Sequence, residues 1–281
     1  MLAAVLLGAA LSATNLVARS VDARLEAASP TNGLARFVGY PNGAKQDSFT
    51  PNPAFWAKDV DFSCASPWNS VHGNLRAGTL ISKRHVLFAK HFPLAKGARI
   101  LFVDRKGDVC PCRIADMRPI ANSDAVVGLL NYEVTPNIRP AKILPLDWAG
   151  ALGAGAGLPV VTLNQKEEAV VGELGGLSPL GGGSWIGARQ PDPGTLRGAF
   201  ARRIVSGDSG NPVFLLVGNE PVLVYCLHTG GGGGGPAGPR GGLPRGRVCL
   251  GLGGGIPGLR RRRCCGPGPG GEWAGGARCC C

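Results

Sequence analysis

Charged residues and long apolar runs are both scarce in this chain of 281 residues. Only 17% of the residues are charged, whereas 44% are hydrophobic, and so apolar a composition argues against a wholly disordered chain. The longest apolar run lies near the N-terminus and is too short and too rich in small residues for a membrane span. The length suffices for one large domain or two small ones with a buried core.

Long helices are also disfavoured, because the chain contains 46 Gly and 23 Pro, and both destabilise helix interiors. The composition therefore argues against a helical bundle. Short β-rich runs bounded by turn residues recur instead between residues 59 and 227, which predicts an all-β sandwich or barrel. These runs span residues 78–81, 85–89, 99–104, 125–130, 158–163, 169–174, 212–217 and 221–227. The Gly- and Ala-rich stretch 149–157 is a candidate linker between two halves.

The N-terminal part differs in composition from this central region. Residues 1–20 begin with an apolar run and contain a small-x-small sequence at Ala10-Leu11-Ser12. They are a candidate leader and favour an exported protein, although no Lys or Arg precedes the run. Residues 21–53 are polar and rich in turn residues, so we expect a disordered linker or arm there.

The C-terminal residues 231–281 contain no Lys, Ser, Thr, Asn or Gln. They hold 20 Gly, 8 Arg, 6 Pro and 6 Cys and carry seven of the chain's twelve net positive charges. The net positive charge of the whole chain therefore says little about the binding partners of residues 1–230. Three hypotheses account for this tail: low-complexity disorder, nucleic-acid binding, or a shifted reading frame in a GC-rich gene. We favour the frameshift, because GC-rich codons read out of frame encode these residues. Nucleic-acid binding is not expected, since the arginines cluster at 260–263 without aromatic residues between them.

A serine flanked by small residues is the most informative feature of the chain. Residues 207–212 read Gly-Asp-Ser-Gly-Asn-Pro. Small neighbours let a turn present the Ser209 side chain, and they leave the N–H groups of Gly207 and Ser209 available to stabilise an oxyanion. On its own, this hexapeptide is as consistent with an ordinary turn between strands.

Two upstream residues favour a nucleophile over a simple turn. His91 ends the run 77–91, which reads as strand, turn, strand and tight turn, and Asp124 precedes the apolar run 125–130. The order His, Asp, Ser along the chain matches one of the known orders of catalytic triads.

With these three motifs, residues 54–230 resemble the chymotrypsin- and trypsin-like serine peptidases, in particular bacterial members. The resemblance implies two antiparallel β-barrels, at about residues 54–148 and 158–230, with the active site in the crevice between them. Residues 231–281 cannot supply the last strand and helix of that fold, so we expect the second barrel to be incomplete.

The resemblance also implies a role for each residue of the motifs. Ser209 is the expected nucleophile, His91 the general base and then acid, and Asp124 the residue that orients His91. Gly207 and Ser209 supply the oxyanion-hole N–H groups, and Asp208 is a structural acid. No metal or cofactor is implied.

The chain departs from the family pattern beside these motifs. Lys90 and Phe92 flank His91 where relatives usually have Ala and Cys, and Asn211 replaces a glycine. No Ile-Val-Gly-Gly-type segment precedes the first barrel, so activation by a newly formed N-terminal amine is not supported.

Two residues are candidates for substrate binding. The run Leu227–Gly231 resembles the Ile-His-x-Gly-Gly pattern of glutamyl endopeptidases, in which the His binds a substrate carboxylate. His228 stands at that position, and Arg203 precedes Ser209 by six residues, near the position that sets the charge of the primary pocket. Together they predict a preference for an acidic residue before the scissile bond. The alternative is that His228 caps a strand and Arg203 is solvated on a loop.

Four cysteines precede the tail: Cys64, Cys110, Cys112 and Cys226. The Cys-Pro-Cys sequence lacks a second ligand pair at zinc-like spacing, so we predict no metal site. A bridge within it would be strained, and the pairing stays open.

The sequence thus predicts a serine endopeptidase that acts on protein or peptide substrates through an acyl-enzyme. The alternative is a catalytically inactive trypsin-like binding module, or a misfolded truncated homologue. An intact set of His91, Asp124 and Ser209 favours the enzyme, because a binding module does not need all three.

Overall fold

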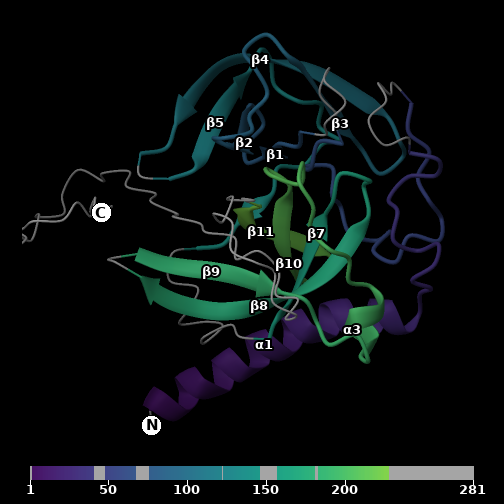
Figure 1. Cartoon of the computed structure of the whole chain (residues 1–281), viewed down its shortest axis with the longest axis vertical. Coiled ribbons are helices and arrows are strands. Elements are labelled where there is room, and N and C mark those ends of the chain that lie inside the picture. Colours follow the sequence, from purple (N-terminus) through teal and green to yellow (C-terminus); the bar gives the residue numbers. More distant parts are fainter. Residues whose placement is uncertain are drawn as a thin grey trace, which may run out of the picture.

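The computed structural model describes residues 2–40, 48–67, 76–121, 123–145, 157–180 and 183–227. These residues form mostly β-structure in two sheets, one above the other in Figure 1. Helix α1 (Leu2–Glu26) runs along the second sheet on the side away from the first sheet. The prediction of a mainly β fold is confirmed, with one sheet formed by strands of residues 79–130 and the other by strands of residues 142–226.

The first sheet has five strands in the order β1-β2-β5-β4-β3, and all neighbours are antiparallel. Its strands are β1 (Thr79–Leu80), β2 (His85–Ala89), β3 (Arg99–Val103), β4 (Val109–Pro119) and β5 (Ala125–Leu130). The long strand β4 pairs with β3 through its first half and with β5 through its second half, with a register shift between Ile114 and Asp116. One strand shared in this way bends the sheet, as a β-bulge does.

The second sheet has six strands in the order β6-β11-β10-β7-β8-β9. Its strands are β6 (Lys142–Ile143), β7 (Pro159–Leu163), β8 (Ala169–Leu180), β9 (Gly183–Arg189), β10 (Pro212–Val217) and β11 (Glu220–Cys226). Only β6 is parallel to its neighbour, β11. A short helix, α3 (Leu196–Ala199), begins at the N-cap Thr195 and lies between β9 and β10 in the sequence.

The main hydrophobic core is shared by both sheets. Phe88 and Phe102 from the first sheet and Phe214 from the second are each fully buried within one cluster. The described cysteines, Cys64, Cys110, Cys112 and Cys226, are all buried free thiols. A second cluster lies where α1 covers the second sheet, and it includes Val17, Val160 and Val213.

The structure differs from the expectation of a disordered arm at residues 21–53. Val17, Val21 and Leu25 are buried, and their spacing of four places them on one stripe of α1 that faces the sheet. Farther along, Phe37 and Phe49 are also buried, and their ring centroids are 4.9 Å apart. Apolar side chains among many polar neighbours therefore anchor this arm to the core.

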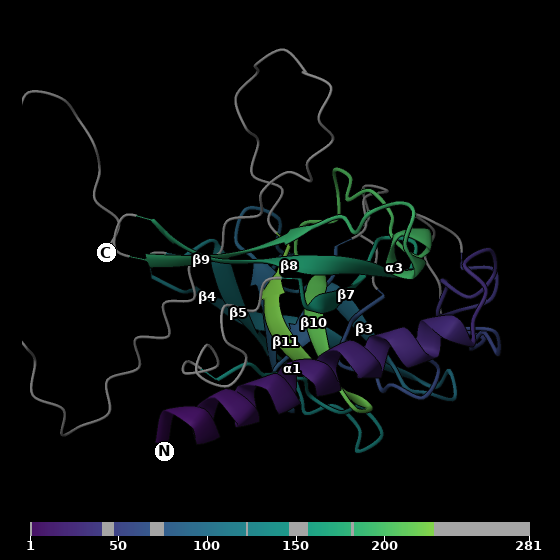
Figure 2. The same cartoon turned by 90° about the horizontal axis from the view of Figure 1, so that it is seen from below.

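Helix α1 is also held by charged side chains. Arg197 in α3 forms an ion pair with Asp22, with Nε 2.7 Å from Oδ1. Arg24 Nη2 lies 2.6 Å from Asp59 Oδ2. Figure 2 shows α1 running across the sheet beside β10 and β11. Residues 2–20 of the candidate leader belong to this helix. None of the described helices is long and apolar enough to cross a membrane.

Candidate active site

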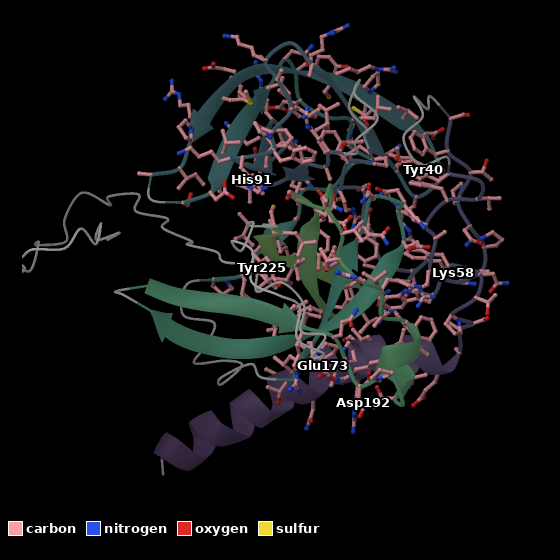
Figure 3. All side chains as sticks on the ribbon, viewed as in Figure 1. Tyr40, Lys58, His91, Glu173, Asp192 and Tyr225 are labelled. Atoms are coloured by element: carbon pink, nitrogen blue, oxygen red, sulfur yellow. The ribbon has the colours of Figure 1, made fainter. Side chains whose placement is uncertain are left out.

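The three residues predicted to form a triad lie within hydrogen-bond distance of one another. His91 Nδ1 is 2.5 Å from Asp124 Oδ2, and His91 Nε2 is 2.9 Å from Ser209 Oγ. The residues come from places distant in the sequence: His91 follows β2 and Asp124 precedes β5 of the first sheet, whereas Ser209 precedes β10 of the second. Figure 3 shows His91 on the side of the first sheet that faces the second.

Strand pairing brings His91 and Asp124 together. In the antiparallel pair of β2 and β5, Ala89 at the end of β2 faces Ala125 at the start of β5. The residues that follow β2 and precede β5 therefore lie side by side. The Lys90 N–H donates to Asp124 O at 2.8 Å, and the His91 N–H donates to Asp124 Oδ1 at 3.0 Å. One carboxylate thus holds both the backbone and the ring of His91.

The histidine and the aspartate are open to solvent, whereas the serine is not. The side chains of His91 and Asp124 are 40% and 38% exposed, but Ser209 is only 3% exposed. The base is therefore accessible from solvent, whereas the hydroxyl beside it is buried.

The turn that carries Ser209 is fixed between the two sheets. Gly210 has a φ of +90°, which glycine adopts at little cost, and its N–H donates to Leu227 O at 2.8 Å. A Cβ at this position would lie 3.0 Å from Ala77 O, just before β1. The close approach of backbone to backbone explains why a glycine follows the serine.

Asp208 anchors the same turn from inside the protein. Its carboxylate is buried and accepts hydrogen bonds from the N–H groups of Val205 (2.8 Å) and Gln165 (3.0 Å) and from the Asn211 amide (3.3 Å). Burial raises the pKa of Asp208, and the hydrogen bonds from Val205 and Gln165 oppose that shift. Groups within the described chain thus satisfy this carboxylate, as expected for a structural acid that needs no new N-terminal amine.

The structure describes only one of the two predicted substrate-binding residues, Arg203. Arg203 is exposed on the segment between α3 and the serine turn, and His228 lies outside the described residues. Beside the histidine, Lys90 is exposed, and the Arg76 guanidinium stacks over the Phe92 ring at 4.5 Å. The contact of Arg76 with Phe92 and that of Gln165 with Asp208 have no local sequence signal. Each of them joins segments that are distant in the chain.

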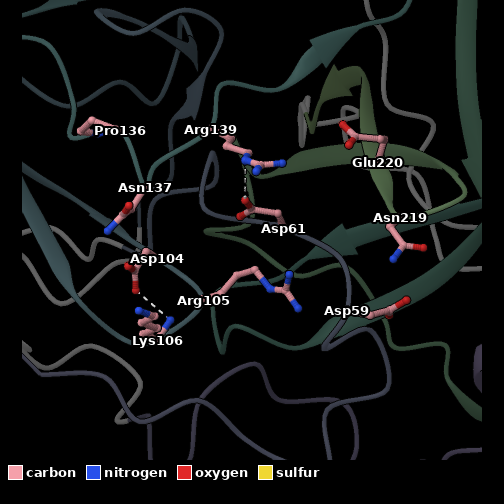
Figure 4. A pocket seen from close by; sticks show the side chains of 10 residues that line it. All are labelled: Asp59, Asp61, Asp104, Arg105, Lys106, Pro136, Asn137, Arg139, Asn219 and Glu220. Atoms are coloured by element: carbon pink, nitrogen blue, oxygen red, sulfur yellow. Dashed lines mark hydrogen bonds and ion pairs between the residues drawn. The ribbon is translucent and has the colours of Figure 1, made fainter.

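A surface hollow of about 420 Å³ lies away from these residues (Figure 4). It is lined by Asp59, Asp61, Asp104, Arg105, Lys106, Pro136, Asn137, Arg139, Asn219 and Glu220. Both acidic and basic side chains line it, and Arg139 Nε lies 3.7 Å from Asp61 Oδ2. None of the predicted site residues lines this hollow.

The structure thus combines two β-sheets with a serine, a histidine and an aspartate at hydrogen-bond distances in series. No family model and no curated protein matches the chain. Among solved structures, the murine norovirus NS6 protease is similar, with 16% identity and a TM-score of 0.39 over 66% of this chain and 90% of that one. An inactive mutant of the same protease, extended at its C-terminus, gives 17% identity and a TM-score of 0.39 over 73% and 96%. Likenesses this distant carry no argument about activity.

Proposed function

We propose that this chain is a serine endopeptidase that hydrolyses peptide bonds through an acyl-enzyme. The observation that carries the proposal is the hydrogen-bonded series from Asp124 through His91 to Ser209, at 2.5 and 2.9 Å. A weak hydroxyl nucleophile needs an adjacent base, and the base needs a third group to fix its tautomer. The two distances support these roles for Ser209, His91 and Asp124.

The chemistry follows from the positions of the atoms. Ser209 Oγ attacks the scissile carbonyl while its proton passes to His91 Nε2, and Asp124 stabilises the resulting imidazolium. The N–H groups of Gly207 and Ser209 are the proposed donors to the oxyanion of the tetrahedral intermediate. The C–N bond then breaks as His91 returns the proton to the leaving amine. Water, deprotonated by His91, cleaves the ester and restores the Ser209 hydroxyl.

A preference for an acidic residue before the scissile bond is part of the proposal. It is supported by His228 in the sequence and by the exposure of Arg203, whose charge is free of burial. Arg203→Gln is then expected to lower kcat/KM for a Glu substrate more than for a matched Gln substrate. Arg202→Gln removes the same charge one residue earlier and should not change that ratio.

Hydrolysis of a quenched fluorescent peptide library, with products identified by mass spectrometry, tests the proposal. Cleavage by the full chain should disappear in Ser209→Ala and persist in Ser206→Ala, which removes the hydroxyl of an exposed serine in the same turn. An inactive binding module would leave every peptide intact. Cleavage that survives in Ser209→Ala would also contradict the proposed nucleophile.

A further inference from the structure

The turn before Ser209 contains a peptide group whose orientation the backbone alone does not fix. Gly207 has a φ of +101°, in a region that glycine occupies about as readily as negative φ. The peptide group between Ser206 and Gly207 can therefore rotate by about half a turn without a side chain at Gly207 to oppose it. Such a rotation would carry the Gly207 N–H away from the position in which it can bind an oxyanion.

Gln165, in the turn between β7 and β8, contacts this peptide group directly. Its Nε2 donates to Ser206 O at 3.2 Å. Its carboxamide also lies against Gly207, since a Cβ at that glycine would be 3.3 Å from Gln165 Oε1. Its backbone N–H donates to Asp208 Oδ1 at 3.0 Å. Gln165 therefore contacts the three consecutive residues that precede Ser209.

The geometry of a trans peptide links the hydrogen bond between Gln165 and Ser206 O to the direction of the Gly207 N–H. In a trans peptide, the C=O of one residue and the N–H of the next point in opposite directions. Because Gln165 holds the Ser206 C=O on its own side of the turn, the Gly207 N–H points to the other side. Within the described part of the chain, the structure gives that N–H no acceptor. The Ser209 hydroxyl lies 2.9 Å from His91 Nε2.

We propose that Gln165 is a positioning residue that locks the oxyanion hole in its working orientation through its hydrogen bond to Ser206 O. The inference rests on the proposed peptidase function. It adds a residue that helps to stabilise the transition state of that reaction. The hydrogen bonds described for the Gln165 side chain go to Ser206 O and not to the reacting atoms, so the side chain acts through the peptide group between Ser206 and Gly207.

Three substitutions of Gln165 distinguish the effect of its hydrogen bond from the effect of a side chain of similar length. Gln165→Met keeps the length and removes the donor, Gln165→Lys keeps a donor, and Gln165→Glu places an acceptor opposite the Ser206 carbonyl. The backbone N–H that binds Asp208 is unchanged in all three. Lys166→Met alters the exposed neighbour in the same turn and is the matched control.

Steady-state kinetics of the full chain on a fluorogenic peptide should show a loss in kcat. We expect Gln165→Met to lower kcat by about 10- to 100-fold with little change in KM, because a misplaced oxyanion donor weakens only the transition state. Gln165→Glu should lose more and Gln165→Lys less. The affinity for a peptide aldehyde, which forms a tetrahedral adduct on Ser209, should fall by the same factor as kcat/KM. The pH at which kcat/KM is half-maximal should not move.

The outcomes distinguish this inference from the proposed function. If a fluorophosphonate labels wild-type Ser209 and Gln165→Met retains full kcat and aldehyde affinity, Gln165 does not lock the hole and the inference fails alone. A Gln165→Met variant that loses thermal stability and raises KM, with Gln165→Lys no better, would show a merely structural role and also overturn it. A wild-type chain that is folded but never labelled would overturn the proposed function together with this inference.

Discussion

The carboxylate of Asp124 serves His91 twice, through the ring and through the backbone. Oδ2 accepts from the ring at 2.5 Å, and Oδ1 accepts from the His91 N–H at 3.0 Å. The ring bond places the proton on Nδ1, so that Nε2 is left to accept the proton of Ser209. A single side chain therefore determines both the tautomer and the orientation of the base.

Asp124→Asn tests this assignment of roles. An amide can donate to Nδ1, which leaves the proton on Nε2 and prevents the ring from accepting the serine proton, so kcat should fall by about ten-thousand-fold. Hydrolysis of a fluorogenic peptide measures the loss. Asp116→Asn removes a half-exposed carboxylate that pairs with Lys96 on the first sheet and should leave kcat unchanged. Near-equal activity of the two variants would contradict the role of Asp124.

The sequence predicts the residues of the triad and the structural acid Asp208 but not the contact that Gln165 makes with the serine turn. Each of His91, Asp124 and Ser209 stands in a short motif next to a β-rich run, and this local pattern identifies it. Gln165 stands in an ordinary turn, and its importance arises only when that turn folds against Ser206. Side-chain contacts between distant segments leave no trace in a local pattern.

At the scale of elements, strand prediction succeeds where apolar runs are bounded by turn residues. Strands β2, β5 and β10 match the predicted ranges 85–89, 125–130 and 212–217. Strand β4 was not predicted, because its sequence contains Pro111 and several charged residues. In the structure Pro111 is exposed, while Cys110 and Cys112 point inward from either side of it. Pairing with β3 and β5 thus outweighs the weak strand propensity of this segment.

Helix α1 is expected to contribute to the stability of the second sheet. Leu25 is 1% exposed, and its replacement by alanine should lower the free energy of unfolding by about 2–4 kcal/mol. Leu16 in the same helix is 49% exposed, and Leu16→Ala should cost less than about 0.5 kcal/mol. Urea unfolding followed by tryptophan fluorescence measures both. Equal, small effects would mean that α1 does not pack on the sheet in solution.

The glycine after the nucleophile is expected to be sensitive to substitution. Gly210→Ala combines a φ of +90° with a Cβ 3.0 Å from Ala77 O, so the turn must shift. We expect a loss of more than about 2 kcal/mol in unfolding free energy and slower reaction of Ser209 with fluorophosphonate. Gly218→Ala meets nothing within 4 Å at a φ of +64° and should cost roughly 1 kcal/mol, without slowing the reaction. Thermal unfolding and the rate of fluorophosphonate labelling are measured for both variants. Equal stability and equal labelling rates in the two would contradict the prediction.

At the scale of the whole molecule, a buried ion pair joins the N-terminal arm to both sheets. Arg36 donates to Val103 O in β3 at 2.7 Å, and it lies 3.6 Å from Glu167 Oε2 in the turn between β7 and β8. Burial raises the pKa of Glu167 to about 7, and Arg36 only partly opposes that shift. The contact between the sheets therefore contains a carboxyl group that titrates near neutral pH.

This raised pKa predicts how stability depends on pH. Between about pH 4.5 and 7 the folded chain retains a proton on Glu167 that the unfolded chain releases, so unfolding becomes easier as pH rises. The unfolding free energy of wild type, relative to Glu167→Gln, should decrease from pH 5 to pH 8. Urea titrations at each pH measure it, with Glu133→Gln as an exposed control. A difference that is constant or increases with pH would show that Glu167 is not buried as described.

The central claim concerns the whole molecule, because the site exists only when the two sheets are docked. It is that His91, Asp124 and Ser209 form a working nucleophile. Fluorophosphonate labelling of the full chain, read by mass spectrometry of its peptides, tests this most directly. We predict a single adduct on Ser209, absent from Ser209→Ala and retained in Ser206→Ala. A folded chain that carries no adduct, or carries it on another residue, would contradict the account.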